Sequence, residues 1–130
     1  MQVKQISVFL ENKSGRLAAV TGLLVREGIN IRALSIADTA DFGILRLIVN
    51  DADRALKVLR EQGFTVSLTE VIGVEMPDEP GGLADIMTVL GEAAINIEYL
   101  YAFLGRGDDG ALVIFRVEDP QRAAMVLADK

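Results

Sequence analysis

The sequence contains no cysteine, no histidine and no tryptophan. Without cysteine the chain has no disulfides, no thiolate metal ligands and no cysteine nucleophile, and without histidine it lacks the commonest general base and metal ligand. A catalytic site would have to rest on Asp, Glu, Lys, Tyr or Arg alone, and the sequence pattern brings no pair of carboxylates together. We therefore expect a protein that is not an enzyme and that holds neither a metal nor a cofactor.

Long apolar runs and clusters of positive charge are missing as well. Although 51% of the 130 residues are hydrophobic, the chain has no run of about 18 apolar residues, the length that crosses a bilayer. No positively charged segment precedes an apolar one as in a signal peptide. The net charge is −6 and Lys and Arg do not cluster, which disfavours binding to nucleic acid phosphates. The expectation is a soluble, cytoplasmic protein with neither a membrane nor a nucleic acid as partner.

What the chain does contain is an internal repeat. Residues 14–18 return as residues 80–84, and residues 28–31 return as residues 94–97, so that Leu17 corresponds to Leu83 and Asn30 to Asn96. Later matches fall two residues further on, which indicates a two-residue insertion in the second copy. A repeat of this length predicts two domains, residues 1–69 and 70–130, each near the lower size limit for a stable core.

Each copy shows the same order of strand and helix patterns. The apolar spacing and the turn residues predict strands over residues 3–10, 29–37, 43–49, 64–68, 71–76, 95–103 and 112–117, with helices over residues 15–28, 51–63, 82–92 and from Asp119 onward. The order βαββαβ predicts an α+β fold of two ferredoxin-like units, each an antiparallel four-stranded sheet with two helices on one face. The sequence ends before the counterpart of the last strand of the second unit, so either a short tail is missing from the sequence or the second unit lacks this strand. Because both faces of the third strand are apolar in each copy, we expect the second sheet face to be covered by the sister unit or by another chain.

Two repeated features are candidates for a ligand site. The loop between the first strand and the first helix, residues 11–15 and again 76–81, combines a glycine with a helix N-terminus, where backbone N–H groups can bind a carboxylate. The same residue types are common in ordinary turns. Asn30 and Asn96 open the second strand of each copy, and an amide that both donates and accepts suits an ammonium-carboxylate ligand. Bracing of the backbone is the alternative role for Asn30.

These residues also carry a family resemblance. Residues 7–15 (Ser-Val-Phe-Leu-Glu-Asn-Lys-Ser-Gly) and residues 27–31 (Glu-Gly-Ile-Asn-Ile) resemble the ACT domain, the small amino-acid-sensing module attached to many enzymes of amino-acid metabolism. The likeness spans essentially the whole chain as two copies, like a free-standing tandem ACT protein. It implies a free amino acid as effector between paired ACT units, assembly into a homodimer or larger homo-oligomer, and a partner metabolic enzyme. The ligand-binding residues that it implies are Asn12, Ser14, Gly15, Asn30, Asp78, Pro80, Gly81 and Asn96.

Other interpretations remain open at this point. Asp78 can accept a charge-assisted hydrogen bond from an ammonium group or act as an ordinary helix N-cap. The first copy also resembles the small regulatory subunit of acetolactate synthase. A structural assembly module without a ligand and a small enzyme of ferredoxin-like fold are further alternatives.

Three more patterns have simpler explanations than a cofactor or metal site. Residues 105–110 match G-x-G-x-x-G, but a strand pattern follows where a dinucleotide site needs a helix, so a hairpin loop is expected. Tyr99 and Tyr101 share one face of a strand and are expected to pack there or to line a pocket. Helix capping and solvated turns explain the acidic pairs better than a cation site does: Asp38 with Asp41, Asp51 with Asp53, and Asp108 with Asp109.

Overall fold

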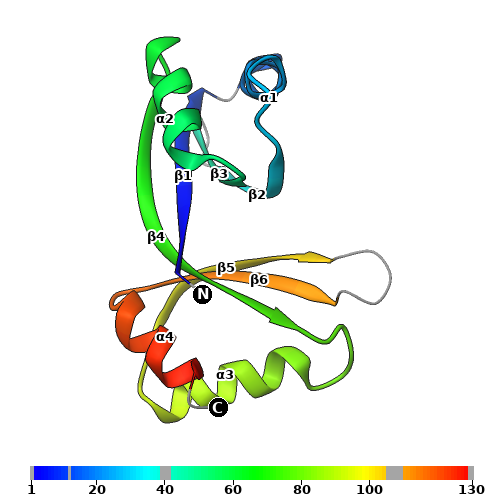
Figure 1. The fold of residues 1–130 in the computed structure, drawn as a ribbon, viewed down its shortest axis with the longest axis vertical. Helices are drawn as coiled ribbons and strands as arrows, with labels where there is room; N and C mark the ends of the chain where they lie inside the picture. The colour runs from blue at the N-terminus through cyan, green and yellow to red at the C-terminus, as the bar shows by residue number, and fades with distance from the viewer. Residues whose placement is uncertain (1, 12, 39–41, 105–109, 129–130) are drawn as a thin grey trace. The chain divides into compact units, whose positions relative to one another are not determined.

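The computed structural model describes residues 2–11, 13–38, 42–104 and 110–128, which form six strands and four helices (Figure 1). The chain divides into two compact units. We call Lys4–Thr69 the N-terminal unit, and the part from Glu70 onward, with Gln2 and Val3, the C-terminal unit. None of the helices in the described part of the chain has the length and apolar character needed to cross a bilayer.

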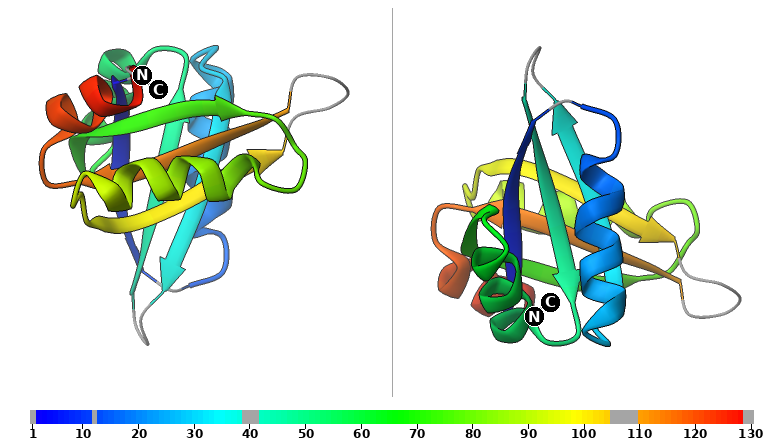
Figure 2. Two further views of the ribbon diagram at one scale, coloured as in Figure 1. Left: turned by 90° about the horizontal axis from the view of Figure 1, so that it is seen from below. Right: turned by 90° about the horizontal axis from the view of Figure 1, so that it is seen from above.

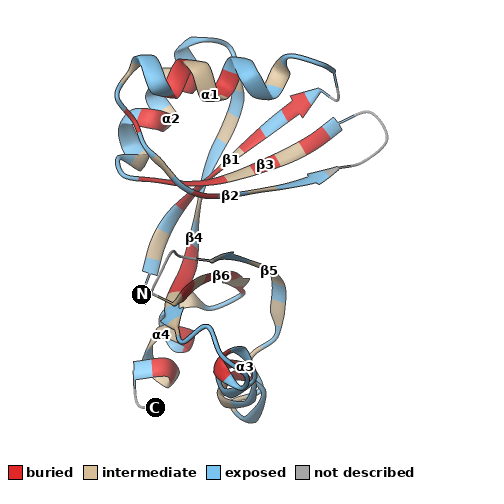
Figure 3. Ribbon diagram, turned by 90° about the vertical axis from the view of Figure 1, so that its right-hand side faces the viewer, coloured by how far each residue is buried: buried red, intermediate tan, exposed pale blue. Residues whose placement is uncertain are grey.

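The N-terminal unit has the predicted βαββαβ order. β3 pairs antiparallel with both β1 and β2, and the strand order is β2-β3-β1-β4. α1 and α2 contact each other and lie on the same side of the sheet (Figure 3). The elements are β1 (Gln2–Glu11), α1 (Arg16–Arg26), β2 (Ile31–Asp38), β3 (Phe42–Val49), α2 (Ala52–Glu61) and the first part of β4 (Thr65–Met76).

The C-terminal unit repeats this order up to its second helix. β6 pairs antiparallel with both β4 and β5, which gives the order β4-β6-β5, and α3 contacts α4 on one side of the sheet. Its elements are the second part of β4, α3 (Gly82–Glu92), β5 (Ile97–Leu104), β6 (Ala111–Val117) and α4 (Pro120–Ala128). Among the described residues no strand follows α4. The start of β1 belongs to this unit instead, since the position of a Cβ on Gly73 would lie 3.5 Å from a methyl group of Val3.

β4 is the one element that differs from the sequence prediction in kind. Residues 64–68 and 71–76 were expected as separate strands, but Thr65–Met76 is one continuous strand of 12 residues. No glycine or proline lies between the two predicted segments, and Thr69 and Val71 are β-branched residues that favour extended backbone. The other elements begin and end within about two residues of their predicted bounds, a margin typical of helix and strand ends.

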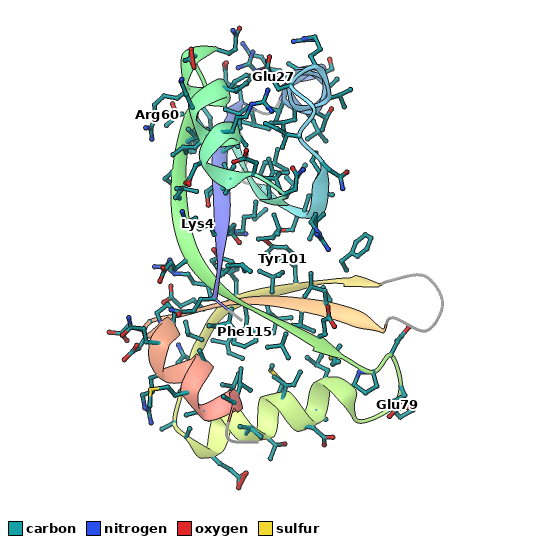
Figure 4. All side chains as sticks on the ribbon, viewed as in Figure 1. Lys4, Glu27, Arg60, Glu79, Tyr101 and Phe115 are labelled. Carbon is teal, nitrogen blue, oxygen red and sulfur yellow. The ribbon has the colours of Figure 1, made fainter. Side chains whose placement is uncertain are left out.

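Each unit has its own apolar core between the sheet and the two helices. In β1 the side chains of Ile6, Val8 and Leu10 point into the core, whereas Phe9 between them is 49% exposed, the alternation expected of a sheet covered on one face. In the C-terminal unit Phe115 of β6 is fully buried between the sheet and the helices (Figure 4). Burial of one sheet face by two helices therefore holds each unit together.

The opposite sheet face of the N-terminal unit keeps an apolar patch. The rings of Phe9 and Phe42 stack with centroids 4.8 Å apart, and both side chains are 40% exposed or more. In the C-terminal unit Ile114, on the corresponding face, is fully buried. That the sister unit or another chain covers the exposed patch stays a prediction.

The turn after the first helix shows how the two copies diverged. Gly28 has a φ of 71°, and its counterpart Ala94 has a φ of 57°. This left-handed conformation costs about 1–2 kcal/mol for a residue with a Cβ.

We expect Ala94→Gly to raise the free energy of unfolding by roughly 0.5–1 kcal/mol, because glycine adopts this conformation without a steric penalty. Gly28→Ala should lower the free energy of unfolding by about the same amount. Urea unfolding followed by circular dichroism measures both. Gly91→Ala in α3 is the control, because Gly91 is helical with open space around its Cβ position, and the same exchange there should stabilise the protein. If Gly28→Ala and Gly91→Ala changed the free energy of unfolding equally, this explanation would be contradicted.

Candidate functional site

The two candidate features lie at opposite ends of the first helix of each unit. The loop that follows β1 leads into the N-terminus of α1, whereas Asn30 follows its C-terminus (Figure 2, right). The 11 residues of α1 separate them by about 16 Å. α3 separates Gly81 from Asn96 in the same way. Within one unit, therefore, the fold does not bring the predicted loop residues and the predicted asparagine together.

The repeated glycine has the same backbone role in both units. Gly15 and Gly81 are the N-cap residues of α1 and α3, with φ of 88° and 94° in the left-handed region. Neither cap makes a side-chain hydrogen bond to its helix. The left-handed φ explains why glycine recurs here. The N–H groups of Arg16 and Gly82 already donate to the carbonyl oxygens of Lys13 and Glu79, and the absence of a capping side chain leaves the next two N–H groups of each helix for another acceptor. Asp78 is not the N-cap of α3, so that alternative interpretation is wrong.

The loop of the C-terminal unit borders a hollow of about 300 Å³. Pro80 and Gly81 line it, as predicted for a site in this loop, but Asp78 is not among its lining residues. Its charged lining is entirely acidic, and Glu79 projects from the loop itself (Figure 4). The complete lining is Val74, Glu75, Met76, Pro77, Glu79, Pro80, Gly81, Gly82, Asp85, Ile86 and Leu127.

The loop of the N-terminal unit has a different character. Asn12 lies outside the described residues, and Ser14 and Gly15 are exposed. Lys13 forms an ion pair with Glu11, with Nζ and Oε2 3.2 Å apart. Arg16, which the sequence analysis did not select, lies with its guanidinium 5.3 Å from the ring centroid of Phe64. One signal in the sequence could have identified Arg16: its counterpart in the second copy is Gly82, although the residues on either side match.

At the start of β2, the backbone of Asn30 is braced by another asparagine. Asn30 N–H donates to Oδ1 of Asn50 at 3.0 Å, and Asn50 N–H donates to the carbonyl oxygen of Asn30 at 3.2 Å. The Asn30 side chain is exposed and makes no hydrogen bond to a described residue. The side chain of Asn50 therefore braces the backbone at this point. The side-chain amide of Asn30 makes no contact among the described residues that would give it a structural role.

Asn96, the counterpart of Asn30, lines a second hollow, of about 350 Å³. Arg122 also lines it and donates from Nη2 to the carbonyl oxygen of Ala93 at 2.5 Å, at the end of α3. Its counterpart Arg54 pairs with Glu27 at the end of α1, with a distance of 3.2 Å between Nη2 and Oε1. A cation at a helix C-terminus interacts favourably with the helix dipole. The hollow is lined by Ala94, Ile95, Asn96, Glu98, Glu118, Asp119 and Arg122.

Comparison with known proteins identifies the family. The family model described as "ACT domain pair" matches residues 1–130. The chain belongs to the ACT domain pair family. The predicted fold class, two ferredoxin-like ACT units, is thereby confirmed.

Individual relatives of this ACT pair differ in how much they share with it. A crystallised protein from Bacteroides thetaiotaomicron is 45% identical with a TM-score of 0.92, over 99% of this chain and 88% of that one. The acetolactate synthase small subunit of Buchnera aphidicola subsp. Baizongia pistaciae (strain Bp) is 33% identical over 92 residues, 68% of this chain and 57% of that protein. The matched part thus spans little more than half of that relative. The regulatory subunit of aspartate kinase from Thermus thermophilus has a TM-score of 0.68 at 18% identity, over 97% of this chain and 91% of that one, and shows the same fold.

The remaining sequence candidates of the ACT pair have structural roles where they are described. Asp51 caps α2 by accepting from Arg54 N–H at 3.2 Å, and Asp53 pairs with Lys4 at 3.2 Å. Within the described ranges, no three acidic side chains gather as a metal site would require. Asp41, Asp108 and Asp109 lie outside the described residues, as do the side chain of Asp38 and most of the G-x-G-x-x-G string. That string connects β5 to β6 rather than to a helix, as predicted.

The tyrosine pair lies on one face of β5, as predicted. Tyr99 is opposite Arg116 of β6 and Tyr101 is opposite Ile114. Both side chains are partly buried. They therefore pack on the sheet surface.

We expect Asn50→Ala to lower the free energy of unfolding by about 1 kcal/mol, because it removes the acceptor of the Asn30 N–H. Asn30→Ala should change it by less than about 0.5 kcal/mol, as is usual for an exposed side chain without partners. Urea titrations of the two variants test the assignment directly. If Asn30→Ala lowered the free energy of unfolding more than Asn50→Ala, the bracing side chain would be that of Asn30.

Proposed function

We propose that this ACT pair is a regulatory protein that binds a free amino acid where two ACT units of assembled copies meet, and modulates an enzyme of amino-acid metabolism. Membership of the ACT pair family supports a regulatory role. The observation that carries the binding proposal is the separation of the loop and the asparagine by the length of α1, in both units alike. One unit supplies only one of them to a ligand, so a site with both needs two units.

The chemistry of each feature suits one end of an amino acid. The N–H groups of the second and third helical residues after Gly15 or Gly81 offer donors to the α-carboxylate. The amide oxygen of Asn30 or Asn96 offers an acceptor to the α-ammonium group. Both amides are exposed, so neither would have to leave a buried position to bind. The proposed ligand residues are Asn12, Ser14, Gly15, Asn30, Asp78, Pro80, Gly81 and Asn96, in units of residues 1–69 and 70–130.

Regulation requires more than binding. The amino acid must favour one assembly or conformational state over another, because a ligand with equal affinity for both shifts nothing. Contacts from two units to one ligand meet this condition, since they form only in the assembled state. We place the protein in the cytoplasm with its enzyme partner, and assign it no catalysis of its own.

Calorimetric titration with each of the twenty amino acids is the test of binding. We expect saturable binding of one amino acid or one side-chain class, and a loss of affinity of tenfold or more in the double variant Asn30→Ala, Asn96→Ala. Lys57→Ala, an exposed change on α2, is the control and should bind as the unmodified protein does. If the double variant bound with unchanged affinity, the asparagines would not belong to the site.

A second candidate is a dedicated subunit of a larger enzyme. The 33% identity to an acetolactate synthase small subunit favours it.

Copurification from native cells separates the two candidates. We expect the tagged protein to be recovered as a free homo-oligomer, because the matched region covers only 57% of that relative. Recovery in a fixed ratio with a large catalytic subunit would instead establish the subunit role.

A further inference from the structure

The first loops of the two units differ in the sign of their charge. The hollow beside the C-terminal loop has Glu75, Glu79 and Asp85 among its lining residues and no Lys or Arg. The N-terminal loop contains Lys13, which is paired with Glu11. The next cation, Arg16, is the first residue of α1. The same backbone geometry thus carries a positive charge without an ion-pair partner among the described residues in one copy, and a group of negative charges in the other.

Arg16 has no acceptor among the residues that the structure describes. Its Nε is buried without a hydrogen-bond partner, and no hydrogen bond or ion pair joins its guanidinium to a described residue. A buried donor without an acceptor is costly, and natural structures rarely leave one in that state. The guanidinium lies 5.3 Å from the ring centroid of Phe64, and this cation–π contact favours its orientation there. Because the Nε is buried, a carboxylate would bind the planar guanidinium through parallel N–H groups of its two terminal nitrogens.

The helix that begins at Arg16 adds a second positive group. α1 has no side-chain cap and no acidic residue in its first turn, whereas α3 has Asp85 there. The N-terminus of α1 therefore keeps its partial positive charge. Two positive groups at one helix start suit a ligand with two carboxylates, one for the backbone N–H groups and one for Arg16.

The C-terminal unit cannot offer the same combination. A Cβ at Gly82, the counterpart of Arg16, would collide with the carbonyl oxygen of Pro77. Any side chain at this position would require the loop to move. The backbone of the C-terminal loop therefore excludes an arginine at the position that corresponds to Arg16.

We propose that Arg16 makes the first loop of the N-terminal unit selective for an acidic amino acid, while the corresponding loop of the C-terminal unit does not select for one. This inference rests on the proposed function. Arg16 acts as the specificity-determining residue by contacting the side-chain carboxylate.

The test compares ligands of equal size and different charge. The full chain is titrated with aspartate against asparagine and with glutamate against glutamine. We expect one acid to bind at least tenfold more tightly than its amide. Arg16→Gln should reduce that ratio to about one, and Arg16→Lys should restore part of it. Arg16→Met keeps the apolar contact with Phe64 and should also lose the preference, which separates charge from packing. Arg26→Gln, at the other end of α1, is the matched control and should keep the preference.

A second measurement separates this inference from the proposed function. Succinate, a dicarboxylate without an amino group, is added while the backbone amide signals of Gly15 and Arg16 are followed by nuclear magnetic resonance. Shifts that saturate in the unmodified protein and vanish in Arg16→Gln support the carboxylate site even if no amino acid binds. Tight binding of an uncharged amino acid that ignores Arg16→Gln overturns the inference and leaves the proposed function standing. If neither succinate nor any amino acid bound, both this inference and the proposed function would be overturned.

Discussion

Apolar burial between one sheet face and two helices is the interaction on which each unit depends. A unit of this size buries only about 60% of the surface that its unfolded chain exposes, so nearly every inward position must be apolar. Val20 and Leu24 fix α1 to the sheet through fully buried side chains. Because the helix is fixed along its length, its two ends are fixed as well. The loop at one end and the asparagine at the other cannot approach each other without the loss of this core.

Duplication has preserved backbone geometry more strictly than side-chain chemistry. Both units keep a left-handed glycine before the first helix, a bulge after the start of the second strand, and an arginine that reaches back to the end of the first helix. The charges around these features have diverged, most clearly where Gly82 stands in place of Arg16. A tandem protein of this kind can therefore present two different sites on one architecture. The two units need not respond to the same ligand.

The structure also separates residues that the fold requires from residues that it does not. Gly15 and Gly81 have a conformational reason to recur, and Asp51 is needed as a helix cap. Asn30 has no comparable contact, because Asn50 braces the backbone beside it. A repeated, exposed amide without a structural role is stronger evidence for ligand binding than a glycine that the backbone conformation requires.

The sequence by itself determined the class of fold and nearly all helix and strand positions. Apolar periodicity, caps such as Asp119 and the repeat are local signals, which act within a few residues or compare one copy with the other. Only the tertiary structure decided that β4 is continuous, that the loop and Asn30 are held apart, and that Arg16 rests on Phe64. The last contact joins residues at opposite ends of one unit's sequence. Such pairings depend on how the strands and helices pack around a shared core, which no local pattern specifies.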